Sequence, residues 1–254
     1  MAHAAAEEGG ADGDHHYMAM ANRAPIATAM AAFVPPDARG LALEIGSGTG
    51  AQLQALAAAF PRLSWRPSEF ATGGAGVAVR GFYEQGPDGP EAGHPVAKAR
   101  SLAALDAALA DELPNVLPAV DLDGAAPFGS WPPAVTTGEG GASLAGGYEL
   151  VFASNVVHIA PWAVAEGIFA GASSALRRGG SLVFHGPFKR DGKYEGLGHE
   201  QLWDEQMRGF NGEGWGIRDV GEMAAEGARH GLRHAASEHP VGPAKNFMLH
   251  FVKE

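Results

Sequence analysis

Three glycines follow a short apolar run at a spacing that could bind an adenosine-containing cofactor. Residues 41–50 read LALEIGSGTG, so Gly46, Gly48 and Gly50 come directly after residues typical of a buried strand. Glycine lets the backbone turn sharply and lets a ligand approach the main chain without meeting a Cβ atom. We therefore assign Gly46, Ser47, Gly48 and Gly50 to a cofactor-binding turn.

Acidic side chains near this turn indicate which cofactor it binds. Glu44 lies two residues before Gly46, where a carboxylate would repel the pyrophosphate of a dinucleotide but attract a sulfonium or an amino group. Glu69 ends the second predicted strand and could bind ribose hydroxyls. Asp121 follows the third predicted strand and could accept the adenine amino group, although Asp123 competes for that role. The three carboxylates favour S-adenosylmethionine (SAM).

The same turn also fits a second cofactor class. Together with Ala51, Gly46 and Gly48 satisfy the G-x-G-x-x-G/A fingerprint of dinucleotide-binding folds. An NAD-dependent oxidoreductase is therefore an alternative.

Polar side chains after the fourth and fifth predicted strands are the catalytic candidates. Methyl transfer needs a nucleophile held in line with the methyl group and a base for its proton, and ligands of an open parallel sheet lie beyond the carboxyl ends of the strands. Asn155 could orient a substrate or the methionine end of the cofactor, and His158 could act as the base. His185 follows the fifth strand and is a third candidate. Alternatively, Asn155 caps a turn and His158 only packs against the sheet edge.

Four further side chains in these segments are substrate-binding candidates. Trp162 could form a wall of the pocket, and Lys189 and Arg190 could bind an anionic carboxylate or phosphate. Tyr194 is a candidate of the same kind. The alternatives are simple packing for Trp162 and a solvated basic loop for Lys189 and Arg190.

A metal site is not expected. The chain has no cysteine, and five of its other histidines show no spacing typical of metal ligands. These histidines are His15, His16, His230, His234 and His239.

Strands that alternate with amphipathic helices position all these residues. Such alternation predicts a mostly parallel sheet with right-handed crossovers, and two final strands without a helix between them predict an antiparallel hairpin. The predicted strands are 41–45, 63–66, 116–120, 148–153, 181–184, 232–238 and 247–252. The predicted helices start at Ala51, near Leu102, near Val164 and at Asp219, where Glu222 completes a capping box. We expect the third of them to end at the RRGG run, residues 177–180.

Composition excludes several classes of protein. The 254 residues carry 18 basic and 29 acidic side chains, a net charge of −11, which disfavours nucleic acid and anionic membranes as partners. Residues 1–16 lack the pattern of a targeting segment, so we expect a disordered tail on a cytoplasmic protein. Residues 17–254 are expected to form one domain with Gly- and Pro-rich loop insertions near 81–95 and 131–147. The oligomeric state is open.

Four segments resemble one family of class I SAM-dependent methyltransferases. They are LEIGSGTG (43–50), WRPSEF (65–70), SNVVHIAPWAVAEGIFAGA (154–172) and HGPFKRDGKY (185–194). They are similar to the domain of unknown function 938 family, which includes methyltransferase-like protein 26. The run Asn22–Ile26 resembles the family's N-terminal element. The resemblance implies the seven-stranded Rossmann-like methyltransferase fold and SAM as cofactor, but no substrate.

The sequence therefore predicts a SAM-dependent methyltransferase that acts on an oxygen, nitrogen or sulfur atom of a small molecule. A small carboxylic acid held by Lys189 and Arg190 is the first acceptor to test. The alternatives are a non-catalytic adenosyl-binding scaffold protein and the NAD-dependent oxidoreductase.

Overall fold

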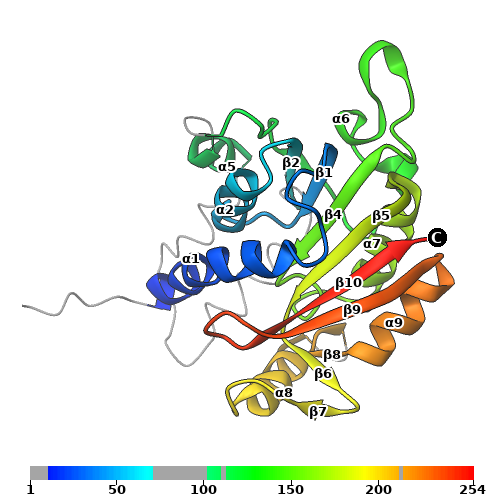
Figure 1. The fold of residues 1–254 in the computed structure, drawn as a ribbon. Coiled ribbons are helices and arrows are strands. Elements are labelled where there is room, and N and C mark those ends of the chain that lie inside the picture. The colour runs from blue at the N-terminus through cyan, green and yellow to red at the C-terminus, as the bar shows by residue number, and fades with distance from the viewer. Residues whose placement is uncertain (1–10, 71–101, 110–112, 212–213) are drawn as a thin grey trace, which may run out of the picture.

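A seven-stranded sheet with helices on both faces forms the centre of the computed structural model (Figure 1). The structure describes residues 11–70, 102–109, 113–211 and 214–254. The strand order is β3-β2-β1-β4-β5-β10-β9, in which β10 runs antiparallel to β5 and β9 and the other pairs are parallel. The strands are β1 Gly40–Ile45, β2 Leu63–Glu69, β3 Val120–Asp121, β4 Tyr148–Ser154, β5 Leu176–Gly186, β9 Leu232–Val241 and β10 Asn246–Lys253. The predicted fold class, with its closing hairpin, is confirmed.

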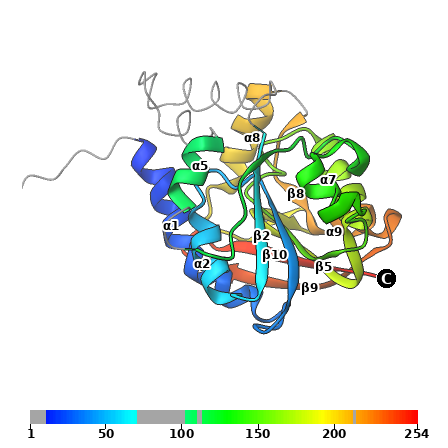
Figure 2. The same ribbon diagram turned by 90° about the horizontal axis from the view of Figure 1, so that it is seen from above.

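The helices cover opposite faces of this sheet, and each face has its own apolar cluster (Figure 2). Helices α1 (Ala11–Met30), α2 (Ala51–Ala59) and α5 (Leu102–Leu109) lie on one face. Helices α7 (Trp162–Ala175) and α9 (Val220–Arg229) lie on the other. Successive strand residues point to opposite faces, so Leu43 packs on the α7 side and Ala42 on the α1 side.

This alternation also decides where the last side chain of each central strand points. Ala42, Phe152 and Val183 all belong to the apolar cluster on the α1 face. Glu44, Ser154 and His185 lie two positions further along the same three strands. Because the side-chain period of a strand is two, these three polar side chains lie on the α1 face, at the carboxyl ends of β1, β4 and β5.

The start of α9 is determined by a local sequence signal, whereas the end of α7 is determined by strand pairing. At the start of α9 the Asp219 carboxylate accepts from the backbone N–H of Gly221 at 2.8 Å, and Glu222 accepts from the N–H of Asp219 at 2.9 Å, as the capping box predicts. The predicted end of α7 is wrong. The helix ends at Ala175, because the next residue, Leu176, already pairs with Tyr148 of β4 and begins β5.

Strand β3 also differs from its prediction. It comprises Val120 and Asp121 only, whereas residues 116–120 were expected to form a strand. Val116 makes an isolated parallel bridge to Trp65, so the chain joins the sheet edge at two separate points.

A small second layer, which the sequence did not predict, lies where β5 ends (Figure 1). It consists of β6 (Phe188–Arg190), β7 (Lys193–Tyr194), β8 (Arg218–Asp219) and α8 (Glu200–Asn211). The three strands form their own sheet, in the order β7-β6-β8. Pairing of β6 with β8 joins segments about 30 residues apart, which local sequence patterns do not specify.

The predicted tail and loop insertions are described only in part. Residues 1–10 and 81–95 lie outside the described residues, and residues 11–16 belong to α1. The second insertion contains η2 (Glu139–Gly141) and α6 (Pro133–Thr136), preceded by η1 (Phe128–Ser130). At its start, Trp131 is buried.

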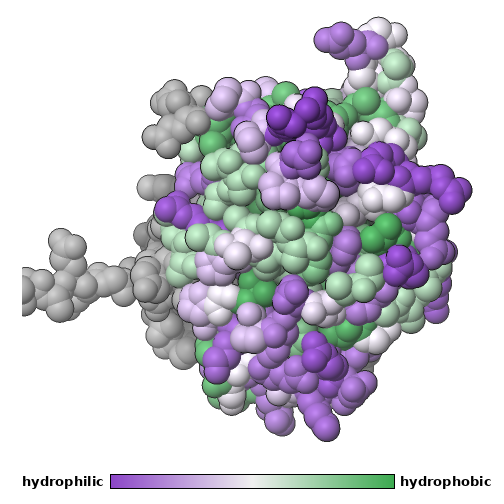
Figure 3. All heavy atoms as spheres, in the orientation of Figure 1, coloured by the Kyte–Doolittle hydropathy of each residue, from purple (hydrophilic) through white to green (hydrophobic). Residues whose placement is uncertain are grey.

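On the face in Figure 3, apolar residues gather across the middle and hydrophilic ones around the rim. Among the described residues, no helix is long and apolar enough to cross a membrane.

Candidate functional site

The predicted glycine turn lies between β1 and α2, and two of its glycines are needed for packing. Gly46, Gly48 and Gly50 have φ angles of 74°, 56° and 79°, in the left-handed region that favours glycine. A Cβ atom on Gly46 would lie 2.6 Å from Cγ2 of Val156, and one on Gly50 would lie 2.9 Å from Cδ2 of Leu109. A Cβ atom on Gly48 would meet no atom of the described residues within 4 Å. The turn is therefore open at Gly48, where a ligand can approach the backbone.

Glu44 is a buried carboxylate without a hydrogen-bond partner. Its side chain is 1% exposed, and neither oxygen makes a hydrogen bond within the described part of the chain. Burial raises the pKa of Glu44 to about 7, against a lowering contribution from the nearby Ser47 side chain and with a smaller raising contribution from the negative charge of Glu69. Buried polar groups in proteins are nearly always paired. An unpaired carboxylate beside a glycine turn is consistent with a ligand that supplies a positive charge or a donor.

The second predicted acid, Glu69, holds the glycine turn in place. Its Oε2 accepts from the backbone N–H of Gly48 at 2.8 Å, and its Oε1 accepts from that of Phe70 at 3.2 Å. The backbone N–H of Ser47 donates to the carbonyl of Ser68 at 2.8 Å, which ties the turn to β2. Each Glu69 oxygen keeps a second lone pair, so the carboxylate can still accept from ribose hydroxyls.

Asp121 lies next to Glu69 on the neighbouring strand. The two residues are direct partners in the pairing of β2 with β3. Asp123, its predicted competitor, instead accepts from the backbone N–H of Ala125 at 2.9 Å and so shapes a turn. Asp121 thus lies beside Glu69 at this edge of the sheet, whereas Asp123 belongs to a local turn.

The segment after β4 brings two of the catalytic candidates to the end of β5. Asn155 has a φ angle of 55°, and its backbone N–H donates to the carbonyl of His185 at 2.8 Å. A Cβ atom on Gly186 would lie 3.4 Å from Oδ1 of Asn155 and 3.6 Å from Nδ1 of His158. The side chains of Asn155 and His158 therefore converge over Gly186, the residue that follows His185.

Both candidate histidines are neutral. His158 and His185 are 3% and 2% exposed, and burial lowers the pKa of each to about 3. The positive charge of Arg218 lowers the pKa of His158 further. The His158 ring also packs at 5.1 Å against the ring of Trp203 on α8. Nδ1 of His185 lies 2.9 Å from the Ser154 hydroxyl, while its buried Nε2 has no partner in the described chain.

Arg218 of β8, which the sequence analysis missed, braces the segment that carries Asn155 and His158. It is 7% exposed, and its guanidinium donates to the carbonyls of Val157 at 3.2 Å and Ala160 at 2.8 Å. It also donates to the carbonyl of Gly214 at 2.6 Å. No local motif marks this arginine, because two of its partners, Val157 and Ala160, lie about 60 residues away along the chain.

The predicted anion-binding cations are paired with acidic side chains. Nζ of Lys189 lies 3.7 Å from Asp204, which also accepts from the Tyr194 hydroxyl at 2.7 Å. Asp204 is 2% exposed and so joins β6 and β7 to α8. Arg190 lies 3.5 Å from Glu195. Lys189, Arg190 and Tyr194 thus hold the small second layer together.

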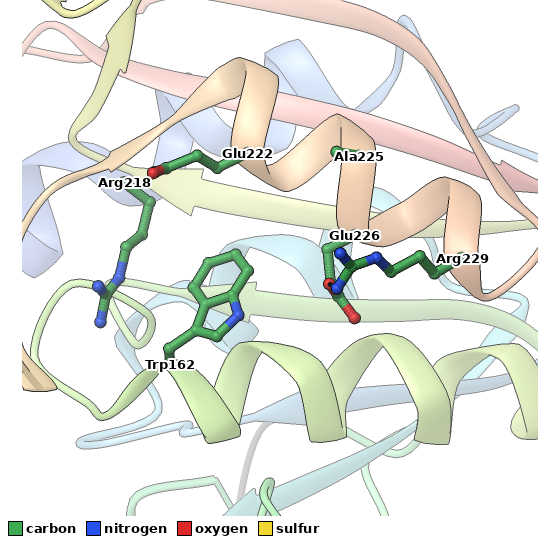
Figure 4. Close-up of a pocket in the computed structure, with 6 residues that line it drawn as sticks. All are labelled: Trp162, Arg218, Glu222, Ala225, Glu226 and Arg229. Carbon is green, nitrogen blue, oxygen red and sulfur yellow. Dashed lines mark hydrogen bonds and ion pairs between the residues drawn. The ribbon is translucent and has the colours of Figure 1, made fainter.

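Trp162, the first residue of α7, packs on the opposite face of the sheet from Glu44, Ser154 and His185. With five other residues it lines a groove of about 390 Å³ between α7 and α9 (Figure 4). The Arg218 guanidinium lies 5.5 Å from its ring centroid. The other lining residues are Glu222, Ala225, Glu226 and Arg229. None of the glycine-turn or histidine positions lines this groove, so Trp162 is not brought together with them.

Among the described residues, no group of three or more histidine, aspartate or glutamate side chains could hold a metal ion.

Comparisons with known proteins agree with the fold. A family described as "Protein of unknown function (DUF938)" matches residues 92–253, more than half of the chain. The chain belongs to the DUF938 family. This is the family whose motifs the sequence resembles.

Solved structures of methyltransferases share the fold of this DUF938 protein. It superposes on the mitomycin 7-O-methyltransferase MmcR with a TM-score of 0.58, at 15% identity, over 96% of this chain and 56% of that one. For human N-acetylserotonin methyltransferase in complex with SAM, the TM-score is 0.56 at 12% identity, and the match covers 91% of this chain and 50% of that one. For an O-methyltransferase from neocarzinostatin biosynthesis, in complex with SAM and a naphthoic acid, the TM-score is 0.52 at 19% identity. That match covers 89% of this chain and 53% of the other. The chain thus has the class I methyltransferase fold and spans about half the length of these proteins.

Proposed function

We propose that this DUF938 protein is a SAM-dependent methyltransferase that acts on a small molecule. The observation that carries the proposal is Glu44, a buried and unpaired carboxylate beside a glycine turn that is open at Gly48. SAM carries an amino group and a sulfonium, and either positive charge would pair with this carboxylate. A dinucleotide would instead bring its phosphates to a negative side chain.

The sheet topology also favours SAM over NAD. In the doubly wound dinucleotide fold the strand order is 3-2-1-4-5-6 and all strands are parallel. Here the strand beyond β5 is the antiparallel β10, as in the methyltransferase structures that share this fold.

The remaining residues suggest how the chain would hold the cofactor and the methyl acceptor. We propose that Glu69 accepts from ribose hydroxyls and Asp121 from the adenine amino group, a proposal supported by their neighbouring positions on β2 and β3. When bound, SAM supplies a methyl group on a positively charged sulfur. Asn155 and His158 would orient the acceptor over Gly186, and a neutral histidine would take its proton.

The acceptor that fits this arrangement is recognised by neutral groups. The carboxylic acid hypothesis depended on Lys189 and Arg190, which contact Asp204 and Glu195. The candidate side chains over Gly186 are an amide and a neutral imidazole. We therefore propose a small molecule with a hydroxyl acceptor, bound without a dedicated cation.

Calorimetric titration with SAM, S-adenosylhomocysteine (SAH) and NAD in parallel tests the cofactor. We expect micromolar binding of the two adenosyl ligands alone. Glu44→Gln should weaken SAM binding about tenfold or more, since hydrogen bonds to charged groups contribute about 1.5–3 kcal/mol. Glu139→Gln is the matched control, because Glu139 is an exposed acid of η2.

Three other outcomes would each contradict a different part of the proposal. Binding of NAD alone would overturn the proposal in favour of an oxidoreductase. If none of the three ligands binds, the cofactor assignment is wrong. Binding of SAM together with failure of a broad screen of small hydroxyl compounds would favour a non-catalytic adenosyl-binding protein.

A further inference from the structure

Ser154, the last residue of β4, belongs to a buried pair whose chemistry the proposed function does not yet use. Its hydroxyl lies 2.9 Å from Nδ1 of His185, the residue directly opposite it in the pairing of β4 with β5. Ser154 is 8% exposed and His185 is 2% exposed. The other ring nitrogen of His185, Nε2, is buried and has no partner among the described residues.

A neutral imidazole carries one N–H donor and one lone-pair acceptor, so two arrangements of this pair are possible. If Nδ1 carries the hydrogen, it donates to the Ser154 oxygen and leaves a lone pair on Nε2. If the Ser154 hydroxyl donates to Nδ1, Nε2 carries a buried N–H without an acceptor. Orphaned buried N–H groups are rarer in proteins than under-satisfied acceptors, so the first arrangement is favoured.

We propose that Ser154 is a positioning residue that fixes His185 with its hydrogen on Nδ1, so that Nε2 accepts the proton of a hydroxyl substrate. This inference rests on the proposed function and adds to it the proton acceptor and the group that orients it. The geometry is suited to the role, because Ser154 and His185 lie on the same face of the sheet as Glu44, at the same ends of neighbouring strands. At about 4.8 Å between strands, β1 and β5 are roughly 10 Å apart across β4.

The proton and electron balance of the step is closed. The acceptor's O–H proton moves to Nε2 while an oxygen lone pair forms the new bond to the methyl carbon. The carbon–sulfur bond breaks, its electron pair stays on sulfur, and the sulfonium becomes a neutral thioether. The positive charge moves from sulfur to the imidazolium, so the buried site carries the same net charge before and after transfer.

The chain contains a matched control for this pair. Ser181 lies four residues before His185, in the middle of β5, and its hydroxyl is 3.0 Å from Nε2 of His250. Both residues are buried and lie on the α1 face, far from the carboxyl ends of the strands. Ser181→Ala therefore removes a similar buried serine–histidine contact without touching the proposed site.

Nitrogen NMR of the full chain labelled with ¹⁵N-histidine tests the proposal directly, with His185→Gln identifying the His185 signals. We expect one tautomer in the wild type, with hydrogen on Nδ1, which becomes a mixture in Ser154→Ala and is unchanged in Ser154→Thr and Ser181→Ala. Hydrogen on Nε2 in the wild type, or an unchanged pattern in Ser154→Ala, would overturn the proposal.

Kinetics on a hydroxyl acceptor found by screening provide the second measurement. Ser154→Ala should lower kcat about tenfold or more with little change in KM, and Ser154→Thr should restore it. An equal loss in Ser181→Ala would indicate a merely structural effect and contradict the inference. Failure of SAM to bind would instead refute the proposed function, whereas the tautomer measurement is independent of that result.

Discussion

Replacing Glu44 with glutamine should make the protein more stable at pH 8. The folded protein keeps the proton of Glu44 up to about pH 7, because burial raises its pKa from 4.5 to about 7. The unfolded chain releases the same proton near its ordinary pKa. Between these values the folded state binds more protons than the unfolded state, so the free energy of unfolding falls as pH rises.

The size of this effect follows from the pKa change. A rise from 4.5 to about 7, at about 1.36 kcal/mol for each pH unit, amounts to about 3 kcal/mol. Glutamine has almost the shape of a protonated glutamate and does not ionise. Glu44→Gln should therefore gain about 3 kcal/mol over the wild type at pH 8, and this difference should disappear by about pH 4.5.

Urea denaturation of both proteins at pH 8 and pH 4.5, without ligand, measures the difference. Glu139→Gln, at an exposed position, should show no such dependence on pH. A variant less stable than the wild type at pH 8, or equally stabilised at both pH values, would refute the reasoning that Glu44 is a buried and unpaired acid.

Three further predictions concern the same site. Gly46→Ala should destabilise the protein more than Gly140→Ala. Both glycines have similar positive φ angles, but of the two only Gly46 would bring a Cβ atom to 2.6 Å from a neighbouring side chain. Thermal denaturation of the two variants measures the difference. Arg218→Met should destabilise the protein by about 2–4 kcal/mol, since it leaves buried carbonyls unpaired, and a loss under 1 kcal/mol in urea would contradict its bracing role. Because the pKa values of His158 and His185 are lowered in the folded protein, the unfolded chain binds more protons than the folded protein below pH 6.5. Each histidine should therefore reduce the free energy of unfolding by about 1.36 kcal/mol for each unit by which the pH falls between about 6.5 and 3. His185→Gln should reduce this slope.

Elements with strong local signals could be predicted from the sequence. The run at 41–45 is apolar and ends at glycines, and it forms β1 almost as expected. Asp219 and Glu222 satisfy each other across one helical turn, so their capping box is formed by neighbours in sequence. The same holds for the glycine turn, whose positive φ angles are a property of its own residues.

The partners of the charged side chains could not be predicted. Lys189 and Tyr194 contact Asp204, and the segment between them gives no sign that α8 will fold back over β6 and β7. Arg218 reaches carbonyls about 60 residues earlier in the chain. Such contacts depend on how remote segments pack, so a basic dipeptide in the sequence does not reveal whether its charges are free.

Buried polar atoms without a partner among the described residues occur in several places, and two such groups lie at the same edge of the sheet. Glu44 and Nε2 of His185 are buried without partners at the carboxyl ends of β1 and β5. Four residues before His185 in β5, the buried Ser181 forms a contact with His250 that satisfies both side chains. Unpaired buried polar groups cost about 1–3 kcal/mol each, so the two at this edge of the sheet are unfavourable for folding alone. A ligand that carries a positive charge at one point and a hydroxyl at another would satisfy both groups, which is the combination that SAM and the proposed acceptor bring together.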